Sequence, residues 1–403
     1  MVNISTFLVF LTLNFRYYLC APSLGSDQDI WSDFGGGNNS FGAFGVPEDN
    51  SRLPRVLNFF PVPVEEECLS TDGRRRGICM NVYECRIQGG KSHGKCALGF
   101  GVCCVFTATC NQEIFNNLTY FVSPDFPDLT KAMTSCNLTV KKIDEEIAQI
   151  RLDFIHFNLG QPNRRTGVCE QDVFIMSGDD SRELKLCGLN SGQHIYFDVD
   201  SIRNPIQINM KLNRRAVSRL WEVIVTQIPF AQRAPTGCLQ YHVGSRGIVQ
   251  TMNFADNGRH LADQDYNICM RQEEGMCSIA YEPCHENSFR IAPNNNGTRR
   301  PALEDDSEGS GGGGLSRSFR ECVDRIVLPC DNEDLIMLGG NGPGSCNMIH
   351  CGETLCPDGE SPCRIESSSI PFTIGIHFEG NAREAPADEN LGMCLLYEQL
   401  PCN

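Results

Sequence analysis

Apolar and polar residues alternate with a period of two in the middle of the chain. Ile150, Leu152 and Phe154 alternate with charged residues, so one face of the segment is apolar. Successive side chains of a β-strand point to opposite faces, and this period predicts a strand that is buried on one side. The same alternation returns in three further segments, at residues 195–199, 206–212 and 221–225. Short strands separated by turn residues predict an all-β protein built from antiparallel β-sandwiches.

Two local features refine this pattern. The alternation slips at Ile155 and resumes at Phe157, as it does where a β-bulge adds one residue to a strand. Residues 143–150 have a spacing that fits a helix as well as a strand, and the sequence alone leaves this choice open.

Two long segments, residues 26–65 and 294–318, have no sustained alternation and no cysteine. Both are rich in Gly, Ser, Asn and Asp, and the second contains the run Gly311–Gly314. Such a composition buries too little apolar surface to offset the entropy lost on ordering. We predict a flexible linker at residues 26–65 and a glycine-rich insert at residues 294–318.

The cysteine content indicates the compartment. The chain has 23 cysteines in 403 residues, a density typical of proteins that fold in an oxidising environment. Residues 4–13 form an apolar run that is too short to span a bilayer but fits the core of a secretory signal. We predict a signal peptide at residues 1–25, a secreted, extracellular protein and no membrane anchor. Because Cys20 would leave with this peptide, an even number of cysteines would remain to pair.

The charge balance narrows the classes of partner. The formal net charge is −16. Proteins that bind nucleic acids or anionic membranes need a positive field, so this charge argues against both classes of partner. A secreted chain is also a substrate for glycosylation at Asn-x-Ser/Thr sequons. The sequons after the predicted signal peptide are at Asn38, Asn117, Asn137 and Asn296.

Residues 66–105 contain six cysteines in a segment too short for an adequate apolar core, so cross-links must stabilise it. The six are Cys68, Cys79, Cys85, Cys96, Cys103 and Cys104. No Cys-x-x-Cys pair of the kind that binds zinc occurs among them. The pattern, which ends in two adjacent cysteines, resembles the clip domain of arthropod extracellular proteins. That resemblance, and not the spacing, implies the disulfides Cys68–Cys103, Cys79–Cys96 and Cys85–Cys104.

Residues 106–232 carry a series of motifs in a fixed order. The motifs are Ser123-Pro124-Asp125-Phe126-Pro127, Leu152-Asp153-Phe154, Phe157-x-Leu159, Cys169-x-x-Asp172 and Leu186-Cys187-Gly188. In order and spacing they resemble a CUB domain. The resemblance implies a jelly-roll-like β-sandwich with the disulfides Cys110–Cys136 and Cys169–Cys187.

Residues 233–403 hold the other twelve cysteines, from Cys238 to Cys402. Cys238-Leu239-Gln240-Tyr241 near the start and Gly392-x-Cys394-x-x-Tyr397 near the end resemble the divergent second CUB domain of arthropod secreted proteins. The glycine-rich insert would lie in one of its loops, where a sandwich tolerates added residues. The sequence does not give the pairing of these cysteines.

The sequence motifs predict that the protein is not an enzyme. Clip domains often precede a trypsin-like protease, but the chain has no Gly-Asp-Ser-Gly-Gly motif, and the nearest string is Gly178-Asp179-Asp180-Ser181. No segment of the roughly 230 residues that such a protease needs remains. We predict no catalytic residue and no cofactor.

Histidines and cysteines also suggest metal binding, but a simpler interpretation exists for each. One group consists of Cys346, His350, Cys351, Cys356 and Cys363, and disulfides are favoured there over zinc because the chain is predicted to be secreted. His194 and His377 occur on predicted strands, where we expect surface or hydrogen-bonded side chains.

The CUB resemblance raises the question of calcium, because many CUB domains hold this ion in end loops through one Glu and two Asp residues. The chain has Gly160 at the position of the Glu and retains only Asp172. Near the last position it offers Asn213, followed by Arg214 and Arg215. We predict no metal site, and interpret Asp172 as a lone remnant that braces its loop by hydrogen bonds to backbone N–H groups.

The run Arg74-Arg75-Arg76 is either a processing site, a glycosaminoglycan contact or a solvated stretch. Together these features predict a secreted, non-catalytic binding protein that recognises an extracellular protein or glycan through the loops of its CUB domains. A structural component of extracellular matrix or cuticle is the first alternative. A non-catalytic cofactor of an extracellular protease cascade is the second.

Overall fold

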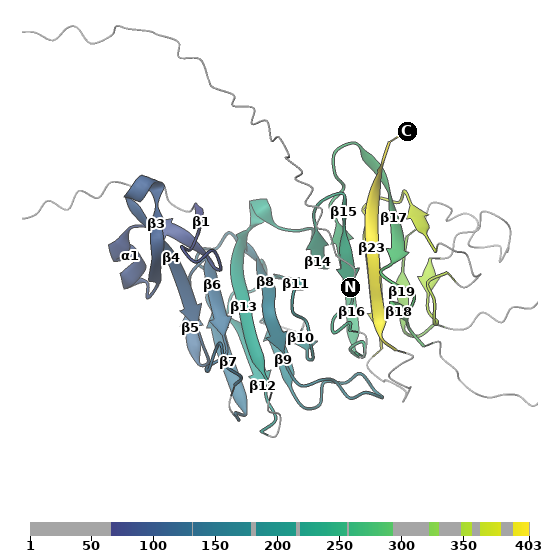
Figure 1. Ribbon diagram of the computed structural model, residues 1–403, viewed down its shortest axis with the longest axis horizontal. Coiled ribbons are helices and arrows are strands. Elements are labelled where there is room, and N and C mark those ends of the chain that lie inside the picture. The colour runs from purple at the N-terminus through teal and green to yellow at the C-terminus, as the bar shows by residue number, and fades with distance from the viewer. Residues whose placement is uncertain are drawn as a thin grey trace, which may run out of the picture. The chain divides into compact units, whose positions relative to one another are not determined.

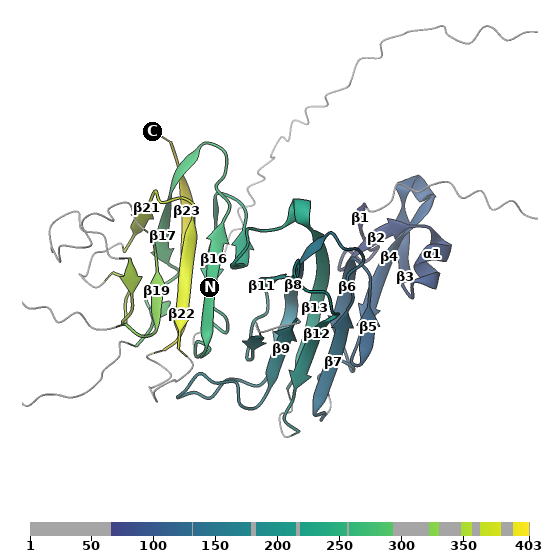
Figure 2. The same ribbon diagram turned by 180° about the vertical axis from the view of Figure 1, so that it is seen from behind.

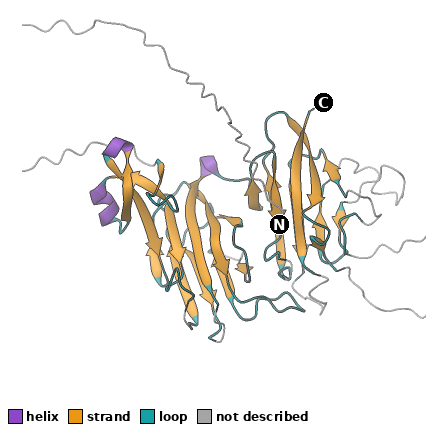
Figure 3. Ribbon diagram, viewed as in Figure 1, coloured by secondary structure: helices purple, strands orange, loops and turns teal. Residues whose placement is uncertain are grey.

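A computed structural model of the chain describes residues 66–402 with eight gaps. The gaps are residues 131, 179–182, 215–217, 256–257, 293–321, 330–347, 357–362 and 380–389. The predicted signal peptide, linker and glycine-rich insert, and the sequons Asn38 and Asn296, lie outside the described residues. Strands make up nearly all the regular structure that is described (Figure 3), so the predicted all-β class is confirmed. No helix in these residues is long and apolar enough to cross a membrane.

The first part of the described chain is a small sheet with one helix, which we call the six-cysteine module. Its elements are β1 (Glu67–Leu69), β2 (Arg76–Met80), α1 (Val82–Ile87), β3 (Lys91–Cys96), the 3₁₀ turn η1 (Ala97–Gly99) and β4 (Gly101–Ala108). Asn81 caps α1 by accepting a hydrogen bond from Tyr83 N. Its disulfides are Cys68–Cys103, Cys79–Cys96 and Cys85–Cys104, the pairs that the clip resemblance implies.

Two sheets form the first sandwich, whose layers Figures 1 and 2 show from opposite sides. Its strands are β5 (Gln112–Ile114), β6 (Leu118–Val122), β7 (Ser135–Val140), β8 (Ile147–Asn158), β9 (Val173–Ser177), β10 (Leu184–Leu186), β11 (His194–Asp198), β12 (Ile206–Lys211) and β13 (Leu220–Pro229). One sheet has the order β6-β13-β8-β11 and the other β10-β9-β12-β7-β5. The residues predicted to face inward are buried between them, among them Ile150, Leu152, Phe154, Ile195, Ile208 and Trp221. Disulfides join Cys110 to Cys136 and Cys169 to Cys187.

Strand β8 accounts for both local features of the sequence pattern, the slip at Ile155 and the ambiguous segment at residues 143–150. The pairing of β8 with β13 shifts where Glu222 lies opposite His156 and Val223 opposite Phe154. Ile155 is the extra residue between them, so the predicted β-bulge is confirmed. Residues 143–150, for which the sequence allowed a helix or a strand, form a turn at 143–146 followed by the start of β8 at Ile147.

The six-cysteine module and the first sandwich share strand β4. Cys103 and Cys104 of this strand are held by module disulfides, and Phe106–Ala108 pair with β6. The chain therefore passes from one part into the other without a linker, and the shared sheet has the order β1-β2-β4-β6-β13-β8-β11, with β3 beside β4. A second apolar cluster covers the outer face of this sheet; it consists of Ile78, Val105, Leu118, Tyr120, Val122 and Ile224.

Three strand pairs run parallel in a fold predicted to be antiparallel. They are β4 with β6, β5 with β7, and, in the second sandwich, β14 (Cys238–His242) with β16 (Gln264–Met270). In each pair the intervening strand lies in another sheet, so the chain crosses over and returns in its original direction.

A second sandwich follows the turn η2 (Phe230–Gln232). Its other strands are β15 (Arg246–Gln250), β17 (Met276–Pro283), β18 (Phe289–Arg290), β19 (Arg325–Val327), β20 (Ile349–His350), β21 (Ile365–Ser367), β22 (Thr373–Phe378) and β23 (Gly392–Pro401). The sheets have the orders β14-β16-β22-β19-β20 and β15-β23-β17-β21, with β18 beside β23. Its disulfides are Cys238–Cys269, Cys277–Cys402, Cys284–Cys394, Cys322–Cys351 and Cys356–Cys363.

Each cysteine in the described residues is part of a disulfide. Cys20, Cys330 and Cys346 lie outside them. If the first leaves with the signal peptide and the other two pair, the mature protein has no free thiol. We therefore expect thiol labelling of the secreted, denatured, unreduced protein to modify no cysteine, and two labelled cysteines per chain would contradict this.

Candidate functional site

A buried ion pair lies at the loop end of the first sandwich, where the sequence places the remnant of the calcium pattern. Arg219 donates from Nε to Asp172 Oδ2 at 2.7 Å and from Nη2 to Asp172 Oδ1 at 2.6 Å. The exposed fractions of the two side chains are 1% and 0%. Gly160 N donates to Oδ2 at 2.7 Å and Asn213 N to Oδ1 at 2.9 Å. Each carboxylate oxygen thus accepts two hydrogen bonds.

The local sequence explains why these two side chains meet. Arg219 lies two residues before Trp221, so it shares the face of the strand that is directed into the core. Asp172 directly precedes β9 and is held close to the core by the Cys169–Cys187 disulfide. Burial alone would raise the pKa of the Asp172 carboxyl, but the hydrogen bonds from Arg219, Asn213 and Gly160 outweigh it and lower the pKa.

This arrangement does not fit calcium. The ion takes six to eight oxygen ligands, preferably with several carboxylates. Here both oxygens of Asp172 already face N–H donors, and a Cβ at position 160 would lie 2.9 Å from Asp172 Oδ2. We predicted that Asp172 braces its loop through backbone N–H groups, and the two contacts are of this kind. Arg219, the main partner, was not among the predicted residues.

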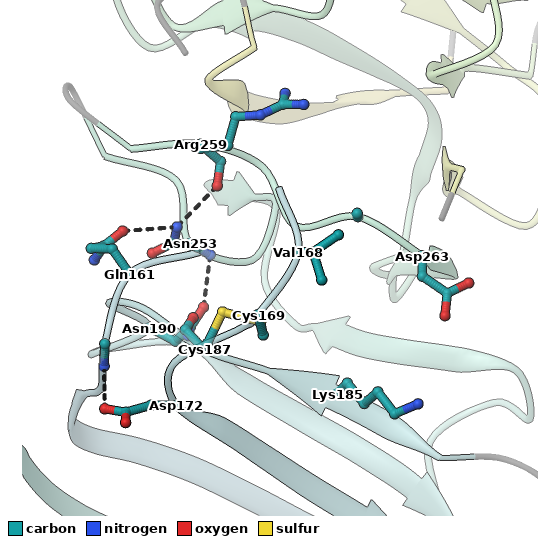
Figure 4. Close-up of a disulfide and its surroundings, with 12 residues drawn as sticks. Gln161, Val168, Cys169, Asp172, Lys185, Cys187, Asn190, Asn253, Arg259 and Asp263 are labelled. Carbon is teal, nitrogen blue, oxygen red and sulfur yellow. Dashed lines mark hydrogen bonds between the residues drawn. A yellow bond between two sulfur atoms is a disulfide. The ribbon is translucent and has the colours of Figure 1, made fainter. Parts of the chain in front are cut away.

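A second buried polar group connects the two sandwiches. Asn253 has an exposed fraction of 0% and a left-handed backbone, with φ 62°. Figure 4 shows its side chain donating to Gln161 Oε1 at 3.1 Å and to Arg259 O at 2.9 Å, while its backbone N–H donates to Asn190 Oδ1 at 2.7 Å. Leu189 N donates to Asn253 Oδ1 at 2.8 Å. We call this group the Asn253 latch. It occupies part of the loop end predicted to bind partners.

Further hydrogen bonds join the sandwiches, and two sets of them involve Gln149 and His194. Gln149 in β8 accepts a hydrogen bond from Ala234 N at 2.8 Å and donates to Ala234 O at 3.1 Å, which fixes the start of the connecting segment. His194 Nε2 lies 2.9 Å from Tyr241 O in β14. His194, predicted as a surface or hydrogen-bonded side chain, is thus hydrogen-bonded and covered by the second sandwich.

This packing covers part of two histidines, His194 and His242. The rings of His194 and His242 lie 4.9 Å apart between their centroids. Burial, together with His194 and Arg151 nearby, lowers the pKa of His242 to about 4. Burial also lowers the pKa of His194, with a further contribution from Arg151. In the second sandwich, burial and Arg259 lower the pKa of His260 to about 3. His377 Nδ1, in contrast, lies 2.9 Å from Asp265 Oδ1 at the surface.

The basic run at residues 74–76 has a structural contact. Arg75 donates from Nε to Glu222 Oε1 at 2.9 Å and lies over the ring of Tyr120, 5.0 Å from its centroid. Glu222 is only 7% exposed on the outer face of β13. Arg75 therefore holds the six-cysteine module against the first sandwich.

Replacing Arg75 with alanine is expected to destabilise this contact, because Glu222 would remain buried without its cation. We expect a loss of about 1–3 kcal/mol in the free energy of unfolding, since a partly exposed pair is worth less than a buried one. Thermal unfolding of the secreted chain measures it. Arg74→Ala, at the exposed neighbouring position, is the matched control, with an expected change within about 0.5 kcal/mol. Equal effects of the two variants would contradict the contact.

The cysteines near His350 are used in disulfides. Cys351 is joined to Cys322 and Cys356 to Cys363, while Cys346 lies outside the described residues. Within the described residues, no three His, Cys, Asp or Glu side chains form a group that could hold a metal ion. Two surface hollows, of about 180 and 240 Å³, lie beside the module, and both are smaller than usual ligand pockets of about 300 Å³ or more.

Comparison with known families matches both sandwiches. Residues 110–224 match the CUB domain and residues 235–400 match the animal CUB domain. Among curated proteins, no significant match is found.

Solved structures that resemble the chain include the CUB1-EGF-CUB2 domains of rat MASP-1, with 14% identity, a TM-score of 0.25 and coverage of 72% of this chain and 100% of that one. The MASP-1 CUB2 domain bound to Ca²⁺ has 18% identity, a TM-score of 0.25 and coverage of 29% and 98%. The full extracellular region of zebrafish Gpr126/Adgrg6 has 13% identity, a TM-score of 0.26 and coverage of 72% and 37%. On the family matches, the chain is a protein with two CUB domains, at residues 110–224 and 235–400.

Proposed function

We propose that this chain is a secreted, non-catalytic binding protein that recognises an extracellular protein or glycan through its CUB domains. CUB domains are generally non-catalytic and typically mediate protein–protein interactions. The observation that supports the proposal most is the presence of two such domains joined by the Asn253 latch. A scaffold with few mobile joints presents loops in a fixed arrangement, which lowers the entropy lost on binding.

We place the recognition surface on the described part of the loop between β6 and β7, at residues 123–130 and 132–134. The neighbouring loops at this end contribute Gln161 and Asn190 to the latch, so they are less available. The loop is anchored where Thr130 N donates to Arg219 O at 2.9 Å. Leu129 beside it is 53% exposed, so a substitution there changes the surface of the loop and leaves the core intact.

Affinity capture with the secreted, glycosylated chain tests this proposal. The bait is exposed in parallel to extracellular fluid and to a matrix extract, and bound molecules are identified by mass spectrometry. We expect specific partners from the fluid, and we expect Leu129→Asp to lose them. Ile143→Asp is the matched control, because Ile143 is 43% exposed at the other end of β7. Capture of partners only from the matrix extract would favour a structural role. If Leu129→Asp captures the same partners as the wild type, the proposed surface is contradicted.

A further inference from the structure

The Asp172–Arg219 pair joins three separate segments of the first sandwich. Asp172 precedes β9, Gly160 follows β8, and Asn213 and Arg219 lie between β12 and β13. The carboxylate accepts hydrogen bonds from the backbone N–H groups of Gly160 and Asn213, in two of these segments. Arg219 Nη2 also donates to Asn213 O. Removing the Asp172 side chain would release contacts in all three segments, and removing that of Arg219 would release its contacts with Asp172 and with Asn213 O.

We infer that the guanidinium of Arg219 is a tethered cation that organises this loop end in place of a bound metal ion. The single carboxylate needs one positive charge in its neighbourhood, because a buried unpaired charge is strongly destabilising. Arg219 supplies that charge, because arginine side chains carry a positive charge throughout the physiological pH range.

The shape of the site also selects a guanidinium. Its planar fork of N–H groups matches both oxygens of one carboxylate, and a further N–H direction remains for a carbonyl. A divalent ion in the same place would meet the positive ends of the N–H groups of Gly160 and Asn213. The loop end is therefore formed before any ion or partner arrives. This inference does not depend on what the protein binds.

Thermal unfolding of the full secreted chain in EDTA and in millimolar calcium chloride tests the inference. The wild-type transition of the first sandwich is expected at the same temperature in both. Arg219→Lys keeps the charge but loses the fork, and is expected to lower the melting temperature by several degrees. Arg219→Met loses the charge as well and is expected to lower it further.

Two more variants keep the test decisive. Asp172→Asn/Arg219→Met removes both charges, and is expected to melt above Arg219→Met even if the single variant barely folds. Arg246→Met removes an exposed arginine, paired with Glu398 in the second sandwich, and should leave the transition unchanged. A calcium-induced rise in the wild-type melting temperature that Asp172→Asn abolishes would overturn the inference, because it would show a metal site. A melting temperature of Arg219→Lys equal to that of the wild type would also overturn it.

Discussion

Replacing Gly188 with alanine is expected to loosen the joint between the two CUB domains. A Cβ at this position would lie 2.1 Å from Asn253 Oδ1, the atom that accepts the hydrogen bond from Leu189 N. Gly188 also has φ +78°, which costs about 1–2 kcal/mol for a residue with a Cβ. Displacing Asn253 adds about 1–3 kcal/mol of overpacking, and its other buried hydrogen bonds are weakened with it.

Gly192 is a matched control in the same loop. Its φ is +82°, but nothing lies within 4 Å of the position of its Cβ. Gly192→Ala therefore shows the cost of backbone strain alone. Calorimetry of the full chain gives the stability of each variant, and hydrogen exchange at Leu189 and Asn253 reports on the latch. Faster exchange at both amides is expected only in Gly188→Ala. If Gly192→Ala has the same effects, the latch does not hold the domains together.

Acidification is expected to destabilise the protein through the partly buried His242 and the buried His260. An unfolded histidine has a pKa near 6.5, whereas His242 in the folded protein has a pKa of about 4. Between these values the unfolded state binds a proton that the folded state does not, so stability falls as the pH falls through this window. The shift corresponds to about 3 kcal/mol at pH 4. His260, with a pKa of about 3, adds a loss of similar size that extends to lower pH.

The contribution of His242 is measured by the free energy of unfolding at pH 7 and pH 4. Protonation would place charge beside His194 and Arg151, while Tyr241 and Tyr397 offer no compensating charge at these pH values. His242→Gln is expected to lose about 3 kcal/mol less than the wild type over this range. An unchanged pH dependence in His242→Gln would show that this imidazole is not responsible.

The sequence predicts those structural features that depend on residues close together along the chain. A period of two locates the core strands of the first sandwich, and the slip at Ile155 locates its bulge. Parallel pairing of β4 with β6 could not be predicted in this way, because it depends on how the chain crosses between sheets. The same applies to the fusion of the module with the first sandwich through β4.

The buried polar contacts are harder to predict from the sequence. Only the contact of Arg219 with Asp172 has a signal in the sequence pattern. Arg219 is in phase with Trp221 and Val223, and this position in a core pattern is the signal that could have predicted a buried acid opposite it. Only Arg214 and Arg215 were considered as nearby cations. Asn253 and Asn190 have no such pattern, because each is specified by a contact with another domain.

One measurement tests both that the loop end needs no calcium and that the chain binds extracellular partners. The wild-type chain is used for affinity capture from extracellular fluid, once in EDTA and once in millimolar calcium. Because Arg219 holds the loops without a metal, we predict the same partners in the same amounts under both conditions. Partners that are captured only in calcium would contradict the account.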